Sequence, residues 1–176
     1  LQGKTLGIIG TGHIGSELSR LANALGMNVI AWTFNPSDEK AAAYGLRYVA
    51  LEQLLGTADV VSLHISLTQD THHLMGSREF GHMKKDALFI NCGRGGLVDT
   101  DALIEALKSG HLGGAGIDVF DPEPIPAGHP LLSMDQVVLT PHCADMTPEG
   151  VDLLNEGAVD NVLAYLGGNP QNVVNP

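Results

Sequence analysis

Short apolar runs rich in Val, Ile and Leu alternate along the chain with segments in which apolar residues recur about every three or four positions. Continuous short runs predict buried strands, and the longer period predicts helices with one apolar face. The strands are predicted over Thr5–Ile9, Asn28–Trp32, Asp59–Ile65, Ala87–Asn91, Ala115–Val119 and Val137–Thr140. The helices are predicted over Ile14–Leu25, Ser37–Tyr44, Leu51–Leu55, Ser77–Met83, Asp101–Lys108 and Pro148–Leu166.

Buried strands that alternate with helices are typical of an α/β fold. Parallel strands need helical crossovers, and these crossovers cover the two faces of the sheet. We therefore predict one α/β domain over residues 1–176, built on a mostly parallel sheet with helices on both faces. Residues 121–130 contain four of the nine prolines. They are predicted to form an ordered loop, because proline fixes φ and lacks an amide hydrogen.

Composition excludes several classes of partner. Hydrophobic residues make up 44% of the 176 residues and charged residues 16%, which is typical of a globular domain that needs neither disulfides nor metals. The net charge of −11 repels nucleic acid and anionic membranes, so neither is an expected partner. No signal peptide or membrane-length apolar run is visible, which predicts a cytoplasmic protein. The two cysteines and eight histidines show no metal-site spacing, so no metal is expected.

A glycine-rich turn follows the first predicted strand. Residues 10–15 read Gly-Thr-Gly-His-Ile-Gly, a G-x-G-x-x-G pattern between a strand and a helix, which is the context of a dinucleotide-binding turn. Gly10 is expected to allow the tight turn, Gly12 the approach of a pyrophosphate, and Gly15 close helix–strand packing. The helix N-terminus adds free amides and a positive dipole end. This turn makes the predicted sheet a doubly wound, Rossmann-type one.

The end of the second predicted strand bears on the choice of dinucleotide. Dinucleotide-binding turns are usually followed about 20 residues later by a carboxylate that binds the ribose hydroxyls. Thr33 occupies that place, and the next carboxylates belong to the following helix. No arginine follows before Arg47, and Lys40 is the nearest cation. We expect NAD as the cofactor, and NADP stays open.

Three further segments carry a resemblance to a known family. They read Ile-Asn-Cys-Gly-Arg-Gly-Gly-Leu-Val-Asp over residues 90–99, Gly-Ile-Asp-Val-Phe-Asp-Pro-Glu-Pro over 116–124, and Leu-Thr-Pro-His over 139–142. Together with the glycine turn, the 61–64 strand and the closing 172–176 segment, the chain resembles the D-2-hydroxyacid dehydrogenase family. The resemblance implies that the chain is the dinucleotide-binding domain. The separate substrate-binding domain is expected to be absent, as the abrupt ends of the chain also indicate.

Three side chains have the chemistry to reduce a 2-keto acid. Arg94 is expected to bind the substrate carboxylate, because guanidinium forms paired, charge-assisted hydrogen bonds with it. His142 is expected to exchange the proton of the substrate oxygen, because its ordinary pKa lies near neutrality. Glu123 is expected to hydrogen-bond the other ring nitrogen of His142 and favour its protonated form. Each of the three also has a purely structural interpretation, as a surface or loop residue.

The family resemblance also implies cofactor contacts. Asp118 is expected to hold the nicotinamide carboxamide, and Thr33 lies where the ribose hydroxyls are usually bound. The remaining residues expected beside the dinucleotide are His13, Ile14, Ile65, Thr71, Cys92, Gly93, Arg94 and His142. His64 is expected to be a packed, hydrogen-bonded residue near the adenine side.

The resemblance implies hydride transfer between a nicotinamide and a 2-keto or 2-hydroxy acid. Glyoxylate, hydroxypyruvate, lactate and phosphoglycerate-type substrates all stay open. Little activity is expected without the missing domain, and a homodimer formed through this domain is expected. One alternative is a corepressor-like module of the same family that senses NAD(H). A second alternative is a relative of formate dehydrogenase, which Glu123 disfavours because that enzyme characteristically has glutamine there.

Overall fold

The computed structural model describes residues 1–174, and the chain divides into two compact units, Leu1–His142 and Cys143–Pro176. The strands of the first unit are β1 (Thr5–Ile9), β2 (Asn28–Trp32), β3 (Arg47–Tyr48), β4 (Val60–Leu63), β5 (Leu88–Asn91), β6 (Gly114–Ile117) and β7 (Val137–Leu139). Its helices are α1 (His13–Ala24), α2 (Asp38–Tyr44), α3 (Leu51–Thr57), α4 (Ser77–His82) and α5 (Thr100–Lys108), with short 3₁₀ helices η1 (Gly95–Leu97) and η2 (Pro130–Ser133). The second unit contains α6 (Pro148–Leu166).

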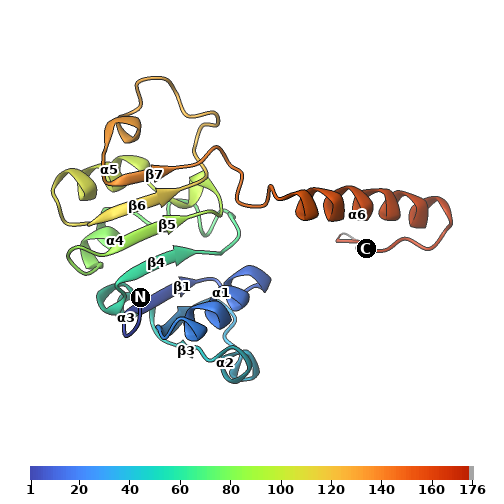
Figure 1. Cartoon of the computed structure of the whole chain (residues 1–176), viewed down its shortest axis with the longest axis horizontal. Coiled ribbons are helices and arrows are strands. Elements are labelled where there is room, and N and C mark those ends of the chain that lie inside the picture. Colours follow the sequence, from blue (N-terminus) through green and yellow to red (C-terminus); the bar gives the residue numbers. More distant parts are fainter. Residues whose placement is uncertain (175–176) are drawn as a thin grey trace. The chain divides into compact units, whose positions relative to one another are not determined.

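The seven strands form one sheet in the order β3-β2-β1-β4-β5-β6-β7, and every neighbouring pair is parallel (Figure 1). The chain builds outward from β1 to β3 in one direction and from β4 to β7 in the other. The order therefore reverses between β1 and β4, which is the switch point of a doubly wound sheet. The predicted Rossmann-type α/β class is confirmed, and the described sheet is parallel throughout.

Alternation along β1 explains how both faces are buried. Leu6 and Ile8 pack on one face with residues of α1 and α2, whereas Ile9 packs on the other face with residues of α3, α4 and α5. Helices of the first unit cover the first face only in part. Leu88 and Val138, whose neighbours Phe89 and Val137 point to the α4–α5 side, keep 43% and 69% of their surface exposed. Within the first unit, helices therefore cover the α3–α5 face throughout and the β1–β3 region of the other face.

Local capping sets several helix boundaries. Ser37 accepts a hydrogen bond from the Lys40 amide, and Gly45 ends α2 in the left-handed region at φ 62°. Asp99 caps α5 through the Ala102 amide. These caps place the ends of α2 and α5 within one residue of the predicted ranges. The two-residue strand β3 was not predicted, because two residues carry no periodic signal.

The second unit is mainly the helix α6, whose range matches the predicted one. Thr147 caps it by accepting from the Gly150 amide, and Pro148 follows at the first helical position, where no amide is needed. Apolar side chains along α6 are largely exposed, including Leu153 at 69% and Leu166 at 74%. In the closing 172–176 segment, Asn172 donates to Asn161, and residues 175 and 176 lie outside the described part. No helix within residues 1–174 is long and apolar enough to cross a membrane.

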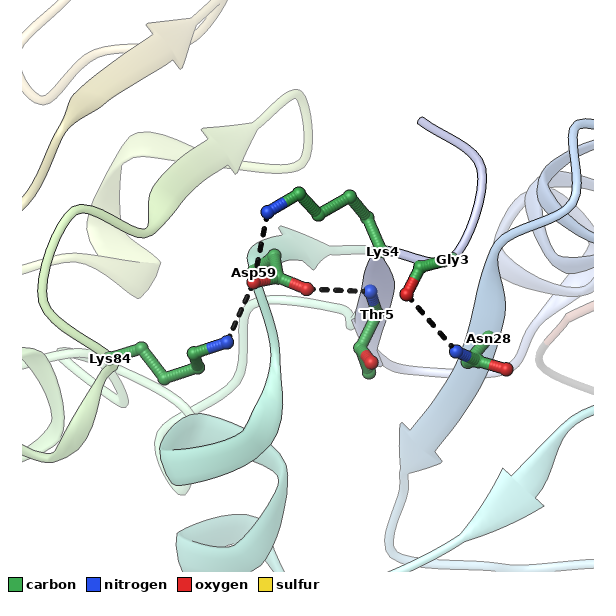
Figure 2. A network of polar contacts seen from close by, with 6 residues as sticks. All are labelled: Gly3, Lys4, Thr5, Asn28, Asp59 and Lys84. Carbon is green, nitrogen blue, oxygen red and sulfur yellow. Dashed lines mark hydrogen bonds and ion pairs between the residues drawn. The ribbon is translucent and has the colours of Figure 1, made fainter.

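A carboxylate ties together the amino ends of the central strands (Figure 2). Asp59 accepts a 2.8 Å hydrogen bond from the Thr5 amide and a 2.6 Å bond from the Lys84 ammonium, and the Lys4 ammonium lies 3.8 Å away. The Asp59 backbone also bonds to Thr5 and to Leu88. Asp59 therefore joins the starts of β1, β4 and β5. The Lys84 hydrogen bond, helped by the Thr5 amide, lowers the pKa of Asp59 below its ordinary value of 3.8.

We expect Asp59→Asn to lower the free energy of unfolding at pH 7 by about 1–2 kcal/mol, because a charge-assisted bond is lost. Because the folded pKa is depressed, the carboxylate stabilises the fold above its ordinary pKa and stops doing so as pH falls through the folded value. The difference from the unmodified chain, measured by urea unfolding, should therefore be full at pH 7 and shrink toward pH 3. Asp135→Asn, an exposed control, should change little. A difference of equal size at both pH values would contradict the role of the Asp59 charge.

Candidate active site

The residues expected at the site gather at one edge of the sheet. Parallel strands all end on the same side, so the loops that follow them are neighbours. The glycine turn follows β1, Thr33 follows β2, and His64 and Ile65 follow β4. Residues 92–94 follow β5, Asp118 follows β6, and the segment ending at His142 follows β7. Thr71 and Glu123 lie in the loops that continue from β4 and β6.

The three glycines of the turn differ in whether the surrounding protein leaves room for a side chain. A Cβ on Gly10, which has φ +99°, would lie 2.5 Å from the His64 carbonyl oxygen. A Cβ on Gly15 would overlap the Gly10 carbonyl oxygen. A Cβ on Gly12 would meet no atom within 4 Å. Protein packing therefore explains Gly10 and Gly15, whereas the space in front of Gly12 is open and suits the close approach of a ligand.

The N-terminus of α1 faces the same open space. Gly12 is its N-cap residue, no side chain caps the helix, and no acidic residue lies in its first turn. His13 and Ile14 are exposed, and Ile14 keeps 73% of its surface accessible. The first-turn amides and the positive end of the helix dipole are therefore available to an anion, as a dinucleotide pyrophosphate requires.

The loop after β4 is shaped by a buried hydroxyl. Thr71 is 1% exposed, and its Oγ1 accepts from the Thr68 amide at 2.7 Å and donates to the Ser66 carbonyl at 2.8 Å. Its oxygen thus serves the loop itself, and its contribution is to hold the shape of the backbone. Ile65 is half-buried at the start of this loop. His64 bonds to the Ser62 hydroxyl at 2.9 Å, and burial lowers the pKa of His64, which favours the neutral ring.

Asn91, which the sequence reasoning missed, organises the loop that carries the arginine. It is 1% exposed at the end of β5, where its Oδ1 accepts from the Gly93 amide at 3.0 Å and its Nδ2 donates to the Arg94 carbonyl at 2.9 Å. Arg94 is exposed, and its guanidinium donates to the Gly93 carbonyl at 2.7 Å. The buried Asn91 side chain therefore fixes the loop backbone, while the Arg94 guanidinium stays accessible.

Glu123 and His142, which lie on different loops, are in direct contact. His142 Nδ1 lies 2.8 Å from Glu123 Oε2, and Glu123 Oε1 accepts from the Phe120 amide at 2.8 Å. The His142 bond, the Phe120 amide and the nearby Arg94 charge hold the pKa of Glu123 below its usual range. Because a carboxylate only accepts hydrogen bonds, Nδ1 carries the hydrogen and Nε2 is left for another partner. The contact predicted from the sequence is present.

The backbone of His142 has an uncommon conformation. Its φ of 53° places a non-glycine residue in the left-handed region, which L-residues rarely adopt. Such conformations persist where the surroundings impose them, and they are found disproportionately at functional sites. The side chain keeps 43% of its surface exposed, and that of Glu123 keeps 37%. The pair is therefore both constrained and accessible.

A buried carboxylate lies between the ends of β6 and β7. Asp118 is 2% exposed and accepts a 2.5 Å hydrogen bond from the Thr140 hydroxyl. Thr140 was not singled out from the sequence, although it lies within the Leu-Thr-Pro-His segment. Burial, and then the Asp118 charge, raise the pKa of the nearby Cys92 thiol. Cys92 is therefore held in its neutral form beside the residue expected to bind the carboxamide.

No group of three or more His, Cys, Asp or Glu side chains within residues 1–174 is arranged to hold a metal ion. The chemistry at this edge is that of an anion-binding turn, one exposed guanidinium and a carboxylate–imidazole pair. These groups suit a dinucleotide and an anionic substrate.

Similar proteins carry the names of 2-hydroxyacid enzymes. The chain is 46% identical over 178 residues to glyoxylate/hydroxypyruvate reductase B of Enterobacter sp. (strain 638), covering 100% of this chain and 55% of that protein. It is 44% identical to the glycerate dehydrogenase of Methylorubrum extorquens and 42% identical to the glyoxylate reductase of Aeropyrum pernix, in each case over 99% of this chain. It covers 54% and 52% of those two proteins. The chain thus spans about half the length of the curated relatives it matches.

The fold of this chain also matches that of solved structures. A crystal structure of D-lactate dehydrogenase with NAD+ from Lactobacillus jensenii superimposes with a TM-score of 0.91 at 36% identity, covering 98% of this chain and 56% of that one. The family model of the D-isomer specific 2-hydroxyacid dehydrogenase NAD binding domain matches residues 1–144. The family resemblance and the expectation of NAD are confirmed. The chain therefore belongs to the D-isomer specific 2-hydroxyacid dehydrogenase family, as an NAD-binding domain of that family.

Proposed function

We propose that this chain is the catalytic, NAD-binding half of an oxidoreductase that interconverts 2-keto acids and D-2-hydroxy acids. The observation that carries the proposal is the 2.8 Å contact between His142 Nδ1 and Glu123 beside the Arg94 charge. This group lies at the same edge of the sheet as the open glycine turn. A cation for a carboxylate, a proton donor for a carbonyl and a site for a redox dinucleotide are together what this reaction requires.

Each of the three side chains has a separate task in the proposal. Arg94 binds the carboxylate of the substrate, because its exposed guanidinium can form two parallel charge-assisted bonds. His142 exchanges a proton with the substrate oxygen through Nε2, and a positioned general acid contributes about 10²- to 10⁴-fold in rate. Glu123 is a positioning residue. Its carboxylate holds the ring by Nδ1 and leaves Nε2 toward the substrate.

The residues that would hold the cofactor follow the strand ends. Gly12, with His13 and Ile14 at the start of α1, would bind the pyrophosphate, and Thr33 would lie beside the adenosine ribose. Asp118 would bind the carboxamide from a position fixed by Thr140. The other residues that would line the dinucleotide are Gly10, Gly15, Ile65, Thr71, Cys92, Gly93, Arg94 and His142. The bound nicotinamide supplies the hydride, and the protein supplies position and the proton.

The substrate class that we propose is that of small 2-keto acids such as glyoxylate and hydroxypyruvate. The support comes from relatives whose names are glyoxylate reductase, glyoxylate/hydroxypyruvate reductase and glycerate dehydrogenase. We also propose that a second, substrate-binding domain completes the enzyme. The half-exposed Glu123–His142 pair supports this, because proton transfer to a carbonyl benefits from a site closed to water.

The glycine turn gives a direct test of cofactor binding. Gly12→Ala should change the free energy of unfolding by less than about 1 kcal/mol, because the added methyl group meets no protein atom. The same change should weaken NADH binding at least about tenfold, since the pyrophosphate needs that space. Urea unfolding and calorimetric titration measure the two effects. Gly10→Ala is the contrasting variant and should destabilise the fold by about 2 kcal/mol or more, because it combines φ +99° with overlap of the His64 carbonyl.

The catalytic assignment requires the whole enzyme, so it is tested in a polypeptide that joins this chain to the remaining half of the Enterobacter relative. His142→Asn should lower kcat for glyoxylate with NADH by about 10²- to 10⁴-fold. Arg94→Gln should mainly raise KM, and Glu123→Gln should lower kcat less than His142→Asn does, because the amide oxygen can still accept from Nδ1. The control His82→Asn, on α4, should leave the rates unchanged. Near-normal kcat in His142→Asn would show that another group supplies the proton.

Two aspects of the cellular setting are proposals as well. We propose a cytoplasmic homodimer, and the exposed apolar side chains Leu88 and Val138 support association with a further protein surface. Light scattering of this chain should give twice the mass of 18.5 kDa at micromolar concentration. A monomer at every concentration tested would contradict pairing through this domain.

A further inference from the structure

A lysine from α2 reaches the glycine turn. The Lys40 ammonium donates a 3.1 Å hydrogen bond to the Thr11 carbonyl, which lies between Gly10 and Gly12. The Thr11 side chain is buried and bonds to the Tyr48 hydroxyl at 3.0 Å, and the Thr11 carbonyl also accepts from the Ser16 hydroxyl at 3.2 Å. Lys40 itself is exposed. Its charge is therefore held beside the turn while its remaining two N–H groups are available to another acceptor.

The end of β2 lies at the same place. The Gly10 amide donates to the Trp32 carbonyl at 2.8 Å, so the residues that follow Trp32 start directly beside the turn. In dinucleotide-binding domains a carboxylate here accepts from the ribose 2′-hydroxyl and repels a 2′-phosphate, whereas a cation nearby accommodates that phosphate. This chain has Thr33 in place of the carboxylate and Lys40 as the cation.

The chain is strongly acidic overall, so a lysine bonded to the glycine turn indicates a specific role for that cation. The chain carries twenty acidic residues against nine basic ones, so a cation bonded to an anion-binding turn is a local exception. Arg47 does not serve the same place, because side chains alternate along a strand and its neighbour Tyr48 is the one that reaches Thr11. Asp38 and Glu39 precede Lys40 in the first turn of α2 and are exposed. Lys40 is thus the cation positioned for a phosphate where the glycine turn meets the end of β2.

We propose that Lys40 determines cofactor specificity by binding the adenosine 2′-phosphate, so that this chain binds NADPH at least as tightly as NADH. The inference rests on the proposed function, since it concerns the same dinucleotide site. The competing role for Lys40 is structural, as a tie between α2 and the turn. The two roles differ in outcome, because a structural tie serves both dinucleotides equally.

Calorimetric titration of the chain with NADPH and with NADH separates the two roles. Lys40→Gln should weaken NADPH binding by about ten- to a hundredfold, the range for one hydrogen bond to a charged group. NADH affinity in the same variant should stay within about twofold, since the ribose hydroxyl does not need the charge. Lys85→Gln is the matched control, because it removes the same charge from an exposed residue before β5, at the opposite edge of the sheet. It should leave both affinities unchanged.

A second variant tests the missing carboxylate. Thr33→Asp should weaken NADPH binding by about tenfold or more through repulsion of the 2′-phosphate, and it should keep or strengthen NADH binding. Adenosine 2′,5′-bisphosphate and adenosine 5′-monophosphate, titrated in the same way, isolate the effect of the 2′-phosphate from that of the nicotinamide. The bisphosphate should bind more tightly to the unmodified chain and lose that advantage in Lys40→Gln.

Four results would overturn the proposal. Binding of NADH with NADPH at least tenfold weaker in the unmodified chain would show that the site excludes the phosphate. Equal weakening of both dinucleotides in Lys40→Gln would leave Lys40 with the structural role alone, and no change in either would leave it with none. Failure of the unmodified chain to bind either dinucleotide would instead refute the cofactor site of the proposed function, and this inference with it.

Discussion

The close approach of the β1 turn to the end of β4 is the constraint on which the site depends. Gly10 lies so near the His64 carbonyl that no side chain fits between them, and its φ of +99° is one that L-residues rarely adopt. This contact brings the first helix to the switch point of the sheet, where neighbouring loops diverge. At the other end of the same two strands, Asp59 bonds to Thr5 and to Lys84. The strand pair β1–β4 is thus fixed at both ends. The positions of the loops that follow the two strands are therefore fixed as well.

Buried polar side chains below the edge hold the exposed reactive groups above it. Asn91 and Asp118, at 1% and 2% exposure, bond to the loops that carry Arg94 and His142. A buried polar group is costly unless it is paired, so these contacts favour a single loop conformation. The reactive groups themselves stay accessible. Buried side chains thus hold the loops, and the exposed groups are free to contact a ligand.

The sequence predicted the parts of the fold that depend on local patterns. Strands and helices with a clear period were placed to within a few residues, and the glycine turn was recognised because its strand–turn–helix context is local. The contact between Glu123 and His142 was predicted from chemistry and family resemblance. The bonds of Tyr48 and Lys40 to Thr11, and of Thr140 to Asp118, join residues far apart in the sequence. No periodic signal encodes such pairs, because each depends on where the sheet order brings two loops.

The accessibility of the Glu123–His142 pair bears on how the proposed reaction would be completed. Charges that face water interact weakly, and the Glu123–His142 pair keeps 37% and 43% of its side-chain surface exposed. The carboxylate therefore orients the ring, and the His142 side chain stays open to solvent. A domain that closes over this edge would exclude water and strengthen the bonds of Arg94 and Glu123 at once. The exposed geometry is thus what a site assembled by closure requires, and the curated relatives, about twice as long as this chain, have the length for such a domain.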